Sequence, residues 1–423
     1  MALGADTVRP RRCVRDVSAV ECIAQRKKGA LKDQVNRPIH GTVHSHQGSI
    51  RIWLMKKKIH SAFAVLFLFL EIVCVQLSAA QSPEKDSSRT KPIGLYPIPI
   101  LFYTPETGIA GGAAALYLYR DPLADSANRP TNFTGDIIYS EKEQIIVELN
   151  GDMYFGNGVY RLFTNTAFKK FPNKFFGIGN NNSSDAEENY TPRSFFIKAV
   201  FSKNVYSRIN IGPILRFETT SILETAPAGL LAPGTIPGSR GGFVSGLGLV
   251  VNWDSRDNTF ASYSGSFYQL TTLLYRRAFG SSFSYDDIQL DVRKFFEVLP
   301  SQVLAIQGVV ENINGVAPFQ NLAHFGGASL LRGYFEGQYR DKTSIALQAE
   351  YRIPLLWRVG AVAFAGIGQV ADNAIRWRAG EFKFSGGAGL RLVMNTEDRV
   401  ALRIDLGYGE NSTGLYISAT EAF

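Results

Sequence analysis

The chain has 423 residues, a formal net charge of +8 and three cysteines, but residues 1–80 hold all of the excess charge and all of the cysteines. These 80 residues contain 13 Lys and Arg against 5 Asp and Glu, so 32 residues of each sign remain in 81–423, where His324 is the one histidine. The composition after residue 80 therefore argues against nucleic-acid binding through net charge, and against disulfides, thiol catalysis, Ser-His-Asp triads and Cys/His metal sites.

The segment that begins at Met55 has the parts of a secretory signal peptide. Three lysines are followed by the apolar run Ala62–Leu70 and, further on, by small residues that end at Ala80. The alternative is a membrane anchor, but Glu71 interrupts the apolar run and leaves it short for a spanning helix. We predict a signal peptide at 55–80, cleaved after Ala80.

Residues 1–54 are unusual, because a signal peptide should begin a protein. They are basic and aperiodic, so we expect translation to start at Met55 and 1–54 to be an upstream extension wrongly joined to the coding sequence. Residues 81–94 are predicted to be a periplasmic linker, and 95–423 a folded domain. An exported chain without cysteine after its signal suits the outer membrane of a bacterium.

Apolar and polar residues alternate from about residue 95 to the end of the chain. In "GGFVSGLGLVVNWD", for example, Phe243, Leu247 and Leu249 lie on one face, and Gly246 and Gly248 on the other. Such alternation predicts long strands with one buried face, and no segment has a convincing amphipathic helix. The predicted strands are 95–103, 108–120, 131–140, 143–155, 158–170, 191–203, 205–218, 240–254, 263–278, 283–296, 302–314, 342–353, 359–370, 383–395, 398–409 and 414–423.

Long alternating strands suit either a soluble sandwich or a transmembrane barrel. Their length exceeds the ~5–6 residues usual in soluble sheets but matches a tilted membrane crossing. One face carries Arg, Lys, Asp, Glu and Gly, as a hydrated lumen would, while Phe and Tyr gather near strand ends, as in interfacial girdles. We therefore predict an all-β fold, a transmembrane antiparallel β-barrel of about sixteen strands.

The three longest gaps between predicted strands are 171–190, 219–239 and 315–341. An even strand count returns both ends of the barrel to the periplasm, and the gaps follow the fifth, seventh and eleventh strands. All three therefore fall on the external side, where long loops belong. The longest of them is expected to be functional rather than a simple connection.

That longest gap contains "HFGGASLLRGYFEGQYRDK", His324–Lys342, which has no strand or helix period. Its many aromatic residues need an apolar environment, and the barrel lumen is the available place. Arg332 would then need a carboxylate in a confined site, which suits its bidentate pairing. Glu350 is the natural partner, because it shares the polar face of the next strand with Gln348 and Arg352. The simpler interpretations are a solvated loop arginine and ordinary charge pairing in a wet lumen.

Several motifs, in this order and spacing, resemble the C-terminal barrel of the BamA/TamA superfamily, the bacterial surface antigen barrels. The motifs are "YTPETG" (Tyr103–Gly108), "DSRDNTF" (Asp254–Phe260), "SLLRGY" (Ser329–Tyr334), "AEYRIPL" (Ala349–Leu355), "FAGIGQVAD" (Phe364–Asp372), "GLR" (Gly389–Arg391) and "RIDLGYG" (Arg403–Gly409). The resemblance implies a sixteen-stranded barrel whose sixth external loop folds into the lumen. It also implies that inner-wall carboxylates hold the Arg-Gly-aromatic tip of this loop.

Two departures from the family pattern matter. Gly366 stands where the family usually has an Asp that helps to hold the loop arginine, so the lock is expected to be weaker or rearranged. The candidate lock residues are Leu331, Arg332, Gly333, Tyr334, Glu350 and Asp372. The family's assembly factors also carry periplasmic POTRA domains before the barrel, whereas about fifteen residues separate Gln81 from the first predicted strand, too few for a folded domain. We therefore expect a short member without POTRA domains.

Three other sets of residues are candidates. A periplasmic turn network, or a simple turn, is expected at Asp254, Arg256 and Asp257. Leu415, Ile417 and Phe423 are expected on one face of the last strand as the C-terminal signal for barrel assembly, although Glu421 would place a charge on that face. Pro97 and Pro99 lack the N–H groups that pair strands, so they predict a weak seam between the first and last strands. The alternative is that these prolines belong to a non-strand lead-in.

Fold alone does not determine function. The leading hypothesis is a barrel related to protein insertion and translocation factors, acting through its seam or lumen. A gated or passive solute pore, and a structural surface barrel, are the alternatives. We expect no enzyme and no cofactor, although a pair of lumen carboxylates is one catalytic arrangement that the composition leaves open. The expected partners are outer-membrane lipids, the barrel-assembly machinery during biogenesis and a separate periplasmic protein, with no nucleic acid.

Overall fold

The computed structural model describes residues 93–119, 131–183, 185–396, 399–419 and 421–423. The predicted upstream extension (1–54), the predicted signal peptide (55–80) and nearly all of the predicted linker (81–94) lie outside these residues. Within the described ranges, no helix is both long enough and apolar enough to cross a membrane.

Sixteen long strands account for most of the described residues. They are β1 (Ile93–Thr104), β2 (Gly108–Tyr119), β3 (Thr131–Ser140), β4 (Ile145–Phe155), β5 (Tyr160–Lys170), β7 (Glu188–Tyr206), β8 (Ile209–Thr225), β9 (Gly242–Asp254), β10 (Gly265–Tyr275), β11 (Ser284–Leu299), β12 (Gln302–Val316), β15 (Thr343–Leu356), β16 (Val359–Ala371), β17 (Lys383–Asn395), β18 (Val400–Gly409) and β19 (Ser412–Ala419). Short elements lie in the loops: β6 (Asn173–Phe175), β13 (Ala323–Phe325), β14 (Tyr339–Asp341) and the 3-10 turns η1 (Arg277–Phe279), η2 (Phe319–Asn321), η3 (Ala374–Arg376) and η4 (Ala379–Glu381).

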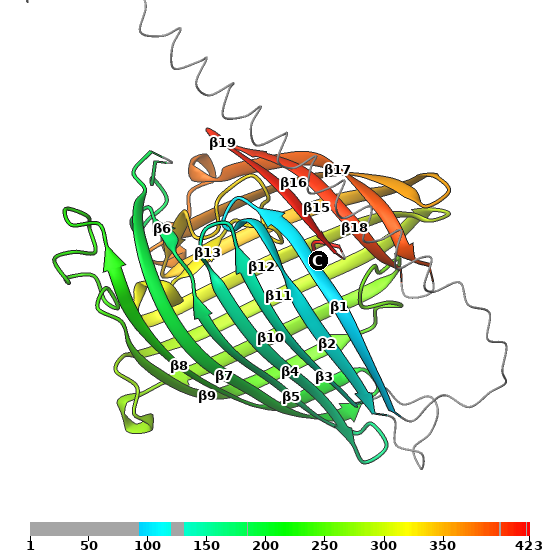
Figure 1. The fold of residues 1–423 in the computed structure, drawn as a ribbon, viewed down its shortest axis with the longest axis horizontal. Coiled ribbons are helices and arrows are strands. Elements are labelled where there is room, and N and C mark those ends of the chain that lie inside the picture. Colours follow the sequence, from blue (N-terminus) through cyan, green and yellow to red (C-terminus); the bar gives the residue numbers. More distant parts are fainter. Residues whose placement is uncertain (1–92, 120–130, 184, 397–398, 420) are drawn as a thin grey trace, which may run out of the picture. The chain divides into compact units, whose positions relative to one another are not determined.

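The long strands form one closed antiparallel barrel (Figure 1). Each pairs with the next along the chain, and β1 also pairs with β19, which closes the sheet. Every predicted strand overlaps an observed one, so the prediction of a sixteen-stranded antiparallel barrel is confirmed. We call the end of the barrel that carries the long loops external and the opposite end periplasmic.

Two strand boundaries differ clearly from the prediction. β8 continues to Thr225, so the loop that follows is 226–241 rather than 219–239. The strand is longer than predicted because β8 stays paired with β7 as far as Tyr190 and Thr225. The last strand ends at Ala419 instead of running to residue 423.

The two faces of the barrel wall follow the sequence alternation. On β9, Leu247 and Leu249 are 43% and 53% exposed on the outer face, where lipid would cover them. On the inner face, Gly246 lies opposite Tyr275, which is fully buried. A Cβ on Gly246 would lie 2.6 Å from the Tyr275 ring, so glycine at this position lets the ring lie flat against the wall.

The long external loops fold back into the barrel. Phe319, from the loop between β12 and β15, packs edge-on against Phe175 at 4.9 Å and Tyr190 at 5.4 Å between ring centroids. Asn182, from the loop between β5 and β7, donates a hydrogen bond to the carbonyl oxygen of Gln338 at 2.9 Å. The external part of the lumen is therefore occupied by loop side chains.

Candidate functional site

The lumen loop comprises residues 317–342, between β12 and β15. Its short strands β13 and β14 pair with each other, and between them the chain runs to a tip at Leu331–Tyr334. The backbone is left-handed at Leu331 (φ 55°) and Gly333 (φ 117°), which turns the chain back within a few residues. Glycine adopts such values without steric cost, whereas leucine adopts them only where its surroundings hold it. Leu331 and Tyr334 are fully buried, so the tip is held by packing on all sides.

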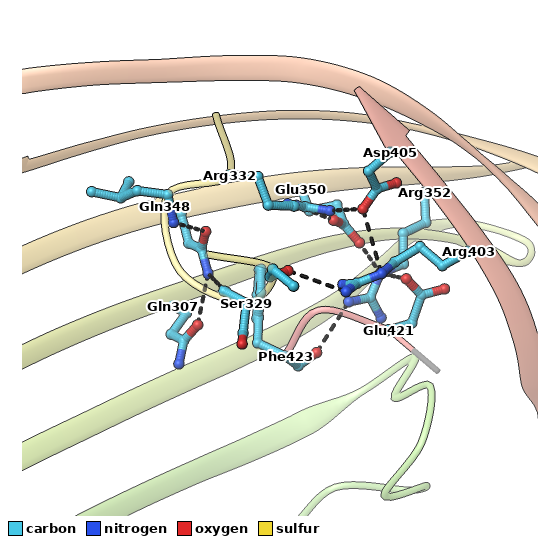
Figure 2. A network of polar contacts seen from close by, with 12 residues as sticks. Gln307, Ser329, Arg332, Gln348, Glu350, Arg352, Arg403, Asp405, Glu421 and Phe423 are labelled. Carbon is cyan, nitrogen blue, oxygen red and sulfur yellow. Dashed lines mark hydrogen bonds and ion pairs between the residues drawn. The ribbon is translucent and has the colours of Figure 1, made fainter. Parts of the chain in front are cut away.

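The Arg332 side chain is completely buried against the barrel wall (Figure 2). Its Nη2 pairs with Glu350 Oε2 of β15 at 2.5 Å, and its Nη1 pairs with Asp405 Oδ2 of β18. The guanidinium also lies 3.6 Å from the ring centroid of Phe364 on β16, a cation–π contact. Three strands of the wall therefore contact one loop side chain.

Further arginines surround these two carboxylates. Arg352 donates to Glu350 at 2.9 Å, Arg391 pairs with Asp405 at 2.6 Å, and Arg403 lies 3.6 Å from the same Asp405 carboxylate. The whole set, which we call the lock network, is Arg332, Glu350, Arg352, Arg391, Arg403, Asp405 and Glu421. Four arginines face three side-chain carboxylates, and Arg352 also donates to the main-chain oxygen of Phe423 at 3.2 Å. Because burying charges costs about as much as their pairing returns, we expect the network to specify one position of the loop more than to add stability.

Glycines in the wall make room for the loop backbone. A Cβ on Gly407 would lie 2.7 Å from the Arg332 carbonyl carbon, and a Cβ on Gly333 would lie 2.6 Å from the Tyr408 backbone. Main chain therefore meets main chain at this position on β18. Any side chain at position 407 would push the tip away from Asp405.

Neutral hydrogen bonds complete the attachment of the tip. The Tyr416 hydroxyl accepts from the Gly333 N–H at 3.0 Å. The Tyr334 hydroxyl donates to the Phe384 carbonyl oxygen at 2.6 Å and accepts from the Glu410 N–H at 2.9 Å. These bonds tie the tip to β17, to β19 and to the β18–β19 turn, so the loop is anchored beside the point where the barrel closes.

The structure brings some of the predicted lock residues together and not others. Arg332 and Glu350 meet, whereas Asp372 pairs with Arg376 at 2.8 Å and is half exposed, away from the tip. The second carboxylate is Asp405, which lies in the motif "RIDLGYG" but is not among the predicted lock residues. The space at Gly366 is taken by Leu331, whose Cδ2 would lie 2.5 Å from a Cβ there.

Comparison with known families identifies the family of this barrel. A model of the Omp85 superfamily domain matches residues 142–414, well over half of the chain. The chain belongs to the Omp85 superfamily. No match was found among curated protein sequences.

Solved structures show the same fold. The barrel is similar to BamA from Haemophilus ducreyi, crystallised without POTRA domains 1–3, with a TM-score of 0.54 and 11% identity over 80% of this chain and 73% of that one. It is also similar to CdiB from Acinetobacter baumannii, with a TM-score of 0.52 and 12% identity over 78% of this chain and 60% of that one. At these identities the likeness supports the fold and carries no residue roles.

The periplasmic turn of this Omp85 barrel between β9 and β10 contains the predicted turn network. Arg256 pairs with Asp254 at 2.9 Å, but Asp257 pairs with Arg399 of the distant β17–β18 turn at 2.5 Å. Burial raises the pKa of Asp257, but the hydrogen bond from Arg399 and two backbone N–H groups outweigh it, and the pKa lies below its usual range. The turn is therefore more than a local reversal, because it contacts a turn several strands away.

The C-terminal residues differ from the prediction. Leu415 and Ile417 lie in β19, but Phe423 is not on the outer face of that strand. It is buried against Phe295 and Val303 on the inner wall. A strand continued to residue 423 would have turned Glu421 toward lipid, where a charge is costly, whereas inside the barrel Glu421 meets Arg391 at 2.8 Å.

The seam residues lie within a strand. Pro97 and Pro99 are part of β1 and are aligned with β2, so they are not a non-strand lead-in. In the described residues β1 pairs with β2 at twelve positions and with β19 at one, Tyr103 with Ile417. The edge of β1 that faces β19 is therefore nearly unpaired among the described residues.

Proposed function

We propose that this outer-membrane barrel acts in inserting polypeptides into the outer membrane, or in moving them across it, through the seam between β1 and β19. The observation that carries the proposal is the single paired position at this seam. A strand edge with free backbone groups accepts another strand readily. The barrel therefore has an edge on which an incoming polypeptide can form hydrogen bonds.

The contents of the lumen favour the seam, rather than an open pore, as the part of the barrel that acts on polypeptides. The buried loop tip and the lock network occupy the interior beside β18 and β19. The charges of that network are mixed in sign, whereas an ion-selective pore usually has rings of one sign. Nothing in this proposal requires a catalytic residue or a cofactor.

Lipids and two kinds of protein partner surround the barrel in the proposed function. Lipids of the outer membrane contact its apolar outer face, and the barrel-assembly machinery inserts it after export by the predicted signal peptide. A separate periplasmic protein delivers the polypeptide to the periplasmic end.

Closing the seam covalently tests the proposal. The chain has no cysteine after residue 80, so a disulfide can be introduced cleanly with Tyr103→Cys and Ile417→Cys, the one aligned pair across the seam. Residues 81–423 are reconstituted in liposomes, and the rate at which an unfolded outer-membrane barrel inserts is measured with and without reductant. We expect acceleration by the reduced protein and none by the oxidised one.

The matched control is a disulfide away from the seam. Leu215 and Leu247 are aligned across β8 and β9 on the outer face, so Leu215→Cys with Leu247→Cys stiffens the barrel without touching the seam. Equal rates for the oxidised and reduced seam variant, or the same loss in the control, contradict the proposal. A steady ion conductance in bilayers with no effect on insertion would favour the pore instead.

A further inference from the structure

Residues 421–423 contact the inner wall at the periplasmic end of the barrel. Phe423 is 9% exposed and packs with Phe295, Val303 and Ala305, with Tyr263 of the β9–β10 turn at its edge. These are neighbouring positions on β11 and β12, since Phe295 and Ala305 are aligned across the two strands. The wall therefore presents an apolar surface that one phenylalanine covers.

Two arginines recognise the polar parts of the same segment. Arg352 donates to the main-chain oxygen of Phe423 at 3.2 Å and lies 5.8 Å from its ring centroid. Glu421 pairs with Arg391 at 2.8 Å and with Arg352 at 3.8 Å. We call the surface formed by Phe295, Val303, Ala305, Arg352 and Arg391 the Phe423 site.

Residues 421–423 leave two hydrogen-bond donors of the Phe423 site without an acceptor among the described residues. Arg352 Nη1 and Arg391 Nη2 are buried, and neither has a hydrogen-bond partner among the described residues. Arg391 Nη2 lies 3.6 Å from Glu350, which is too far for a hydrogen bond. A buried guanidinium N–H without an acceptor carries a free-energy cost. The site can therefore accept a carboxylate placed better than that of Glu421.

The alternative place for residues 421–423 is a poor one. Antiparallel pairing keeps the sum of aligned residue numbers constant, so the alignment of Tyr103 with Ile417 would place Glu421 opposite Pro99 and Phe423 opposite Pro97. Proline has no N–H to give to a neighbouring strand. In this register residues 421–423 would gain few hydrogen bonds from β1, which favours their place in the lumen. The other residues of β1 keep their N–H groups, so a polypeptide in another register can still pair with this edge.

We propose that the Phe423 site is a recognition site for a polypeptide segment that carries a carboxylate two residues before a phenylalanine. Residues 421–423 are its resident occupant and are displaced by another polypeptide that presents the same pair. The inference goes beyond the proposed function, because recognition at this site does not require the seam to open. If both hold, the site selects which polypeptides the barrel handles.

Peptide binding tests the inference on residues 81–423 in detergent. A fluorescent peptide of sequence Thr-Glu-Ala-Phe, amidated at its end, is titrated into the wild type and into Phe423→Ala. A tethered occupant acts at an effective concentration of about a millimolar, so its removal should increase the apparent affinity roughly tenfold or more. In Phe423→Ala, the peptides Thr-Gln-Ala-Phe and Thr-Glu-Ala-Ala should each bind much more weakly than Thr-Glu-Ala-Phe.

A second variant tests whether the peptide binds at the Phe423 site. Ala305 is fully buried beside Phe423, so Ala305→Phe in the Phe423→Ala background should fill the site and abolish peptide binding. Equal affinity of the three peptides for Phe423→Ala, or equal affinity of Thr-Glu-Ala-Phe for wild type and Phe423→Ala, overturns the inference, even if Ala305→Phe does not fold. Peptide binding without any effect of the barrel on insertion would refute the proposed function and leave the site standing.

Discussion

The lock network predicts an unequal response to the removal of its two central partners. Arg332→Met leaves Glu350 and Asp405 each with another arginine, Arg352 at 2.9 Å and Arg391 at 2.6 Å. Glu350→Gln instead removes a carboxylate that lies within 3.6 Å of three arginines, Arg332, Arg352 and Arg391. The docked loop should therefore lose more stability in Glu350→Gln than in Arg332→Met, although both variants break the same ion pair.

The magnitude follows from the contacts that each variant loses. Arg332 makes two charge-assisted hydrogen bonds, worth about 1.5–3 kcal/mol each, and a cation–π contact with Phe364 worth about 1 kcal/mol. Arg332→Met keeps the apolar stem, and removing one partner of a buried ion pair costs about 3–5 kcal/mol, somewhat less than these contacts taken together, so we expect a loss of this size for the docked loop. Glu350→Gln should lose at least ~1–2 kcal/mol more, because buried positive charges remain uncompensated.

Two assays measure the effect on residues 81–423. The free energy of unfolding in urea is followed by the gel mobility of the folded barrel, and loop release is followed by conductance in planar bilayers. A loss of 3 kcal/mol raises the undocked population about hundredfold, so a mostly closed wild type should give variants that open or flicker.

The double variant decides whether charge balance is the cause. Arg332→Met with Glu350→Gln removes the arginine and the carboxylate of one ion pair together, so the net charge of the network equals that of the wild type. It should therefore be more stable than Glu350→Gln alone. A Glu350→Gln barrel as stable as Arg332→Met, or a double variant less stable than either, would refute the reasoning.

Two further predictions concern Gly407 of β18 and the periplasmic turn that contains Asp257. Gly407→Ala should open the barrel in bilayers because its Cβ would collide with the Arg332 backbone, whereas Gly386→Ala, whose nearest neighbour would be 3.5 Å away, should stay closed; equal conductance would contradict this. The pKa of Asp257 is lowered in the folded state by Arg399 despite burial, so its contribution is present above an unfolded pKa of about 4 and lost as the pH falls through the folded pKa. The wild type should therefore lose more thermal stability between pH 6 and pH 3 than Asp257→Asn does, and identical losses would count against the contact.

The strand pattern was predictable from the sequence because it is a local property. Period-two alternation depends on which side chains face lipid and which face the lumen, and this holds for each strand separately. The pairing of Arg332 with Glu350 was also within reach. A buried arginine needs a carboxylate, and the inner face of the next strand supplied one.

Which residues pair with each other across the barrel depends on how the barrel closes. Asp405 reaches Arg332, and Arg399 reaches Asp257, only because strands far apart in the chain curve toward the same interior. Alternation assigns a residue to a face but gives neither its height on the barrel nor its opposite neighbour. Asp372 was therefore assigned to the lock wrongly, although its sequence position was a reasonable match.

Residues 421–423 show most clearly which features the sequence determines and which depend on the tertiary structure. The sequence by itself determined a long alternating barrel wall, an interior arginine and a first strand with two prolines. The tertiary structure alone decided that Phe423 turns inward, because the competition is between an outer face where Glu421 would meet lipid and an inner wall where it meets Arg391. Such a choice compares two distant environments, and no local pattern contains that comparison.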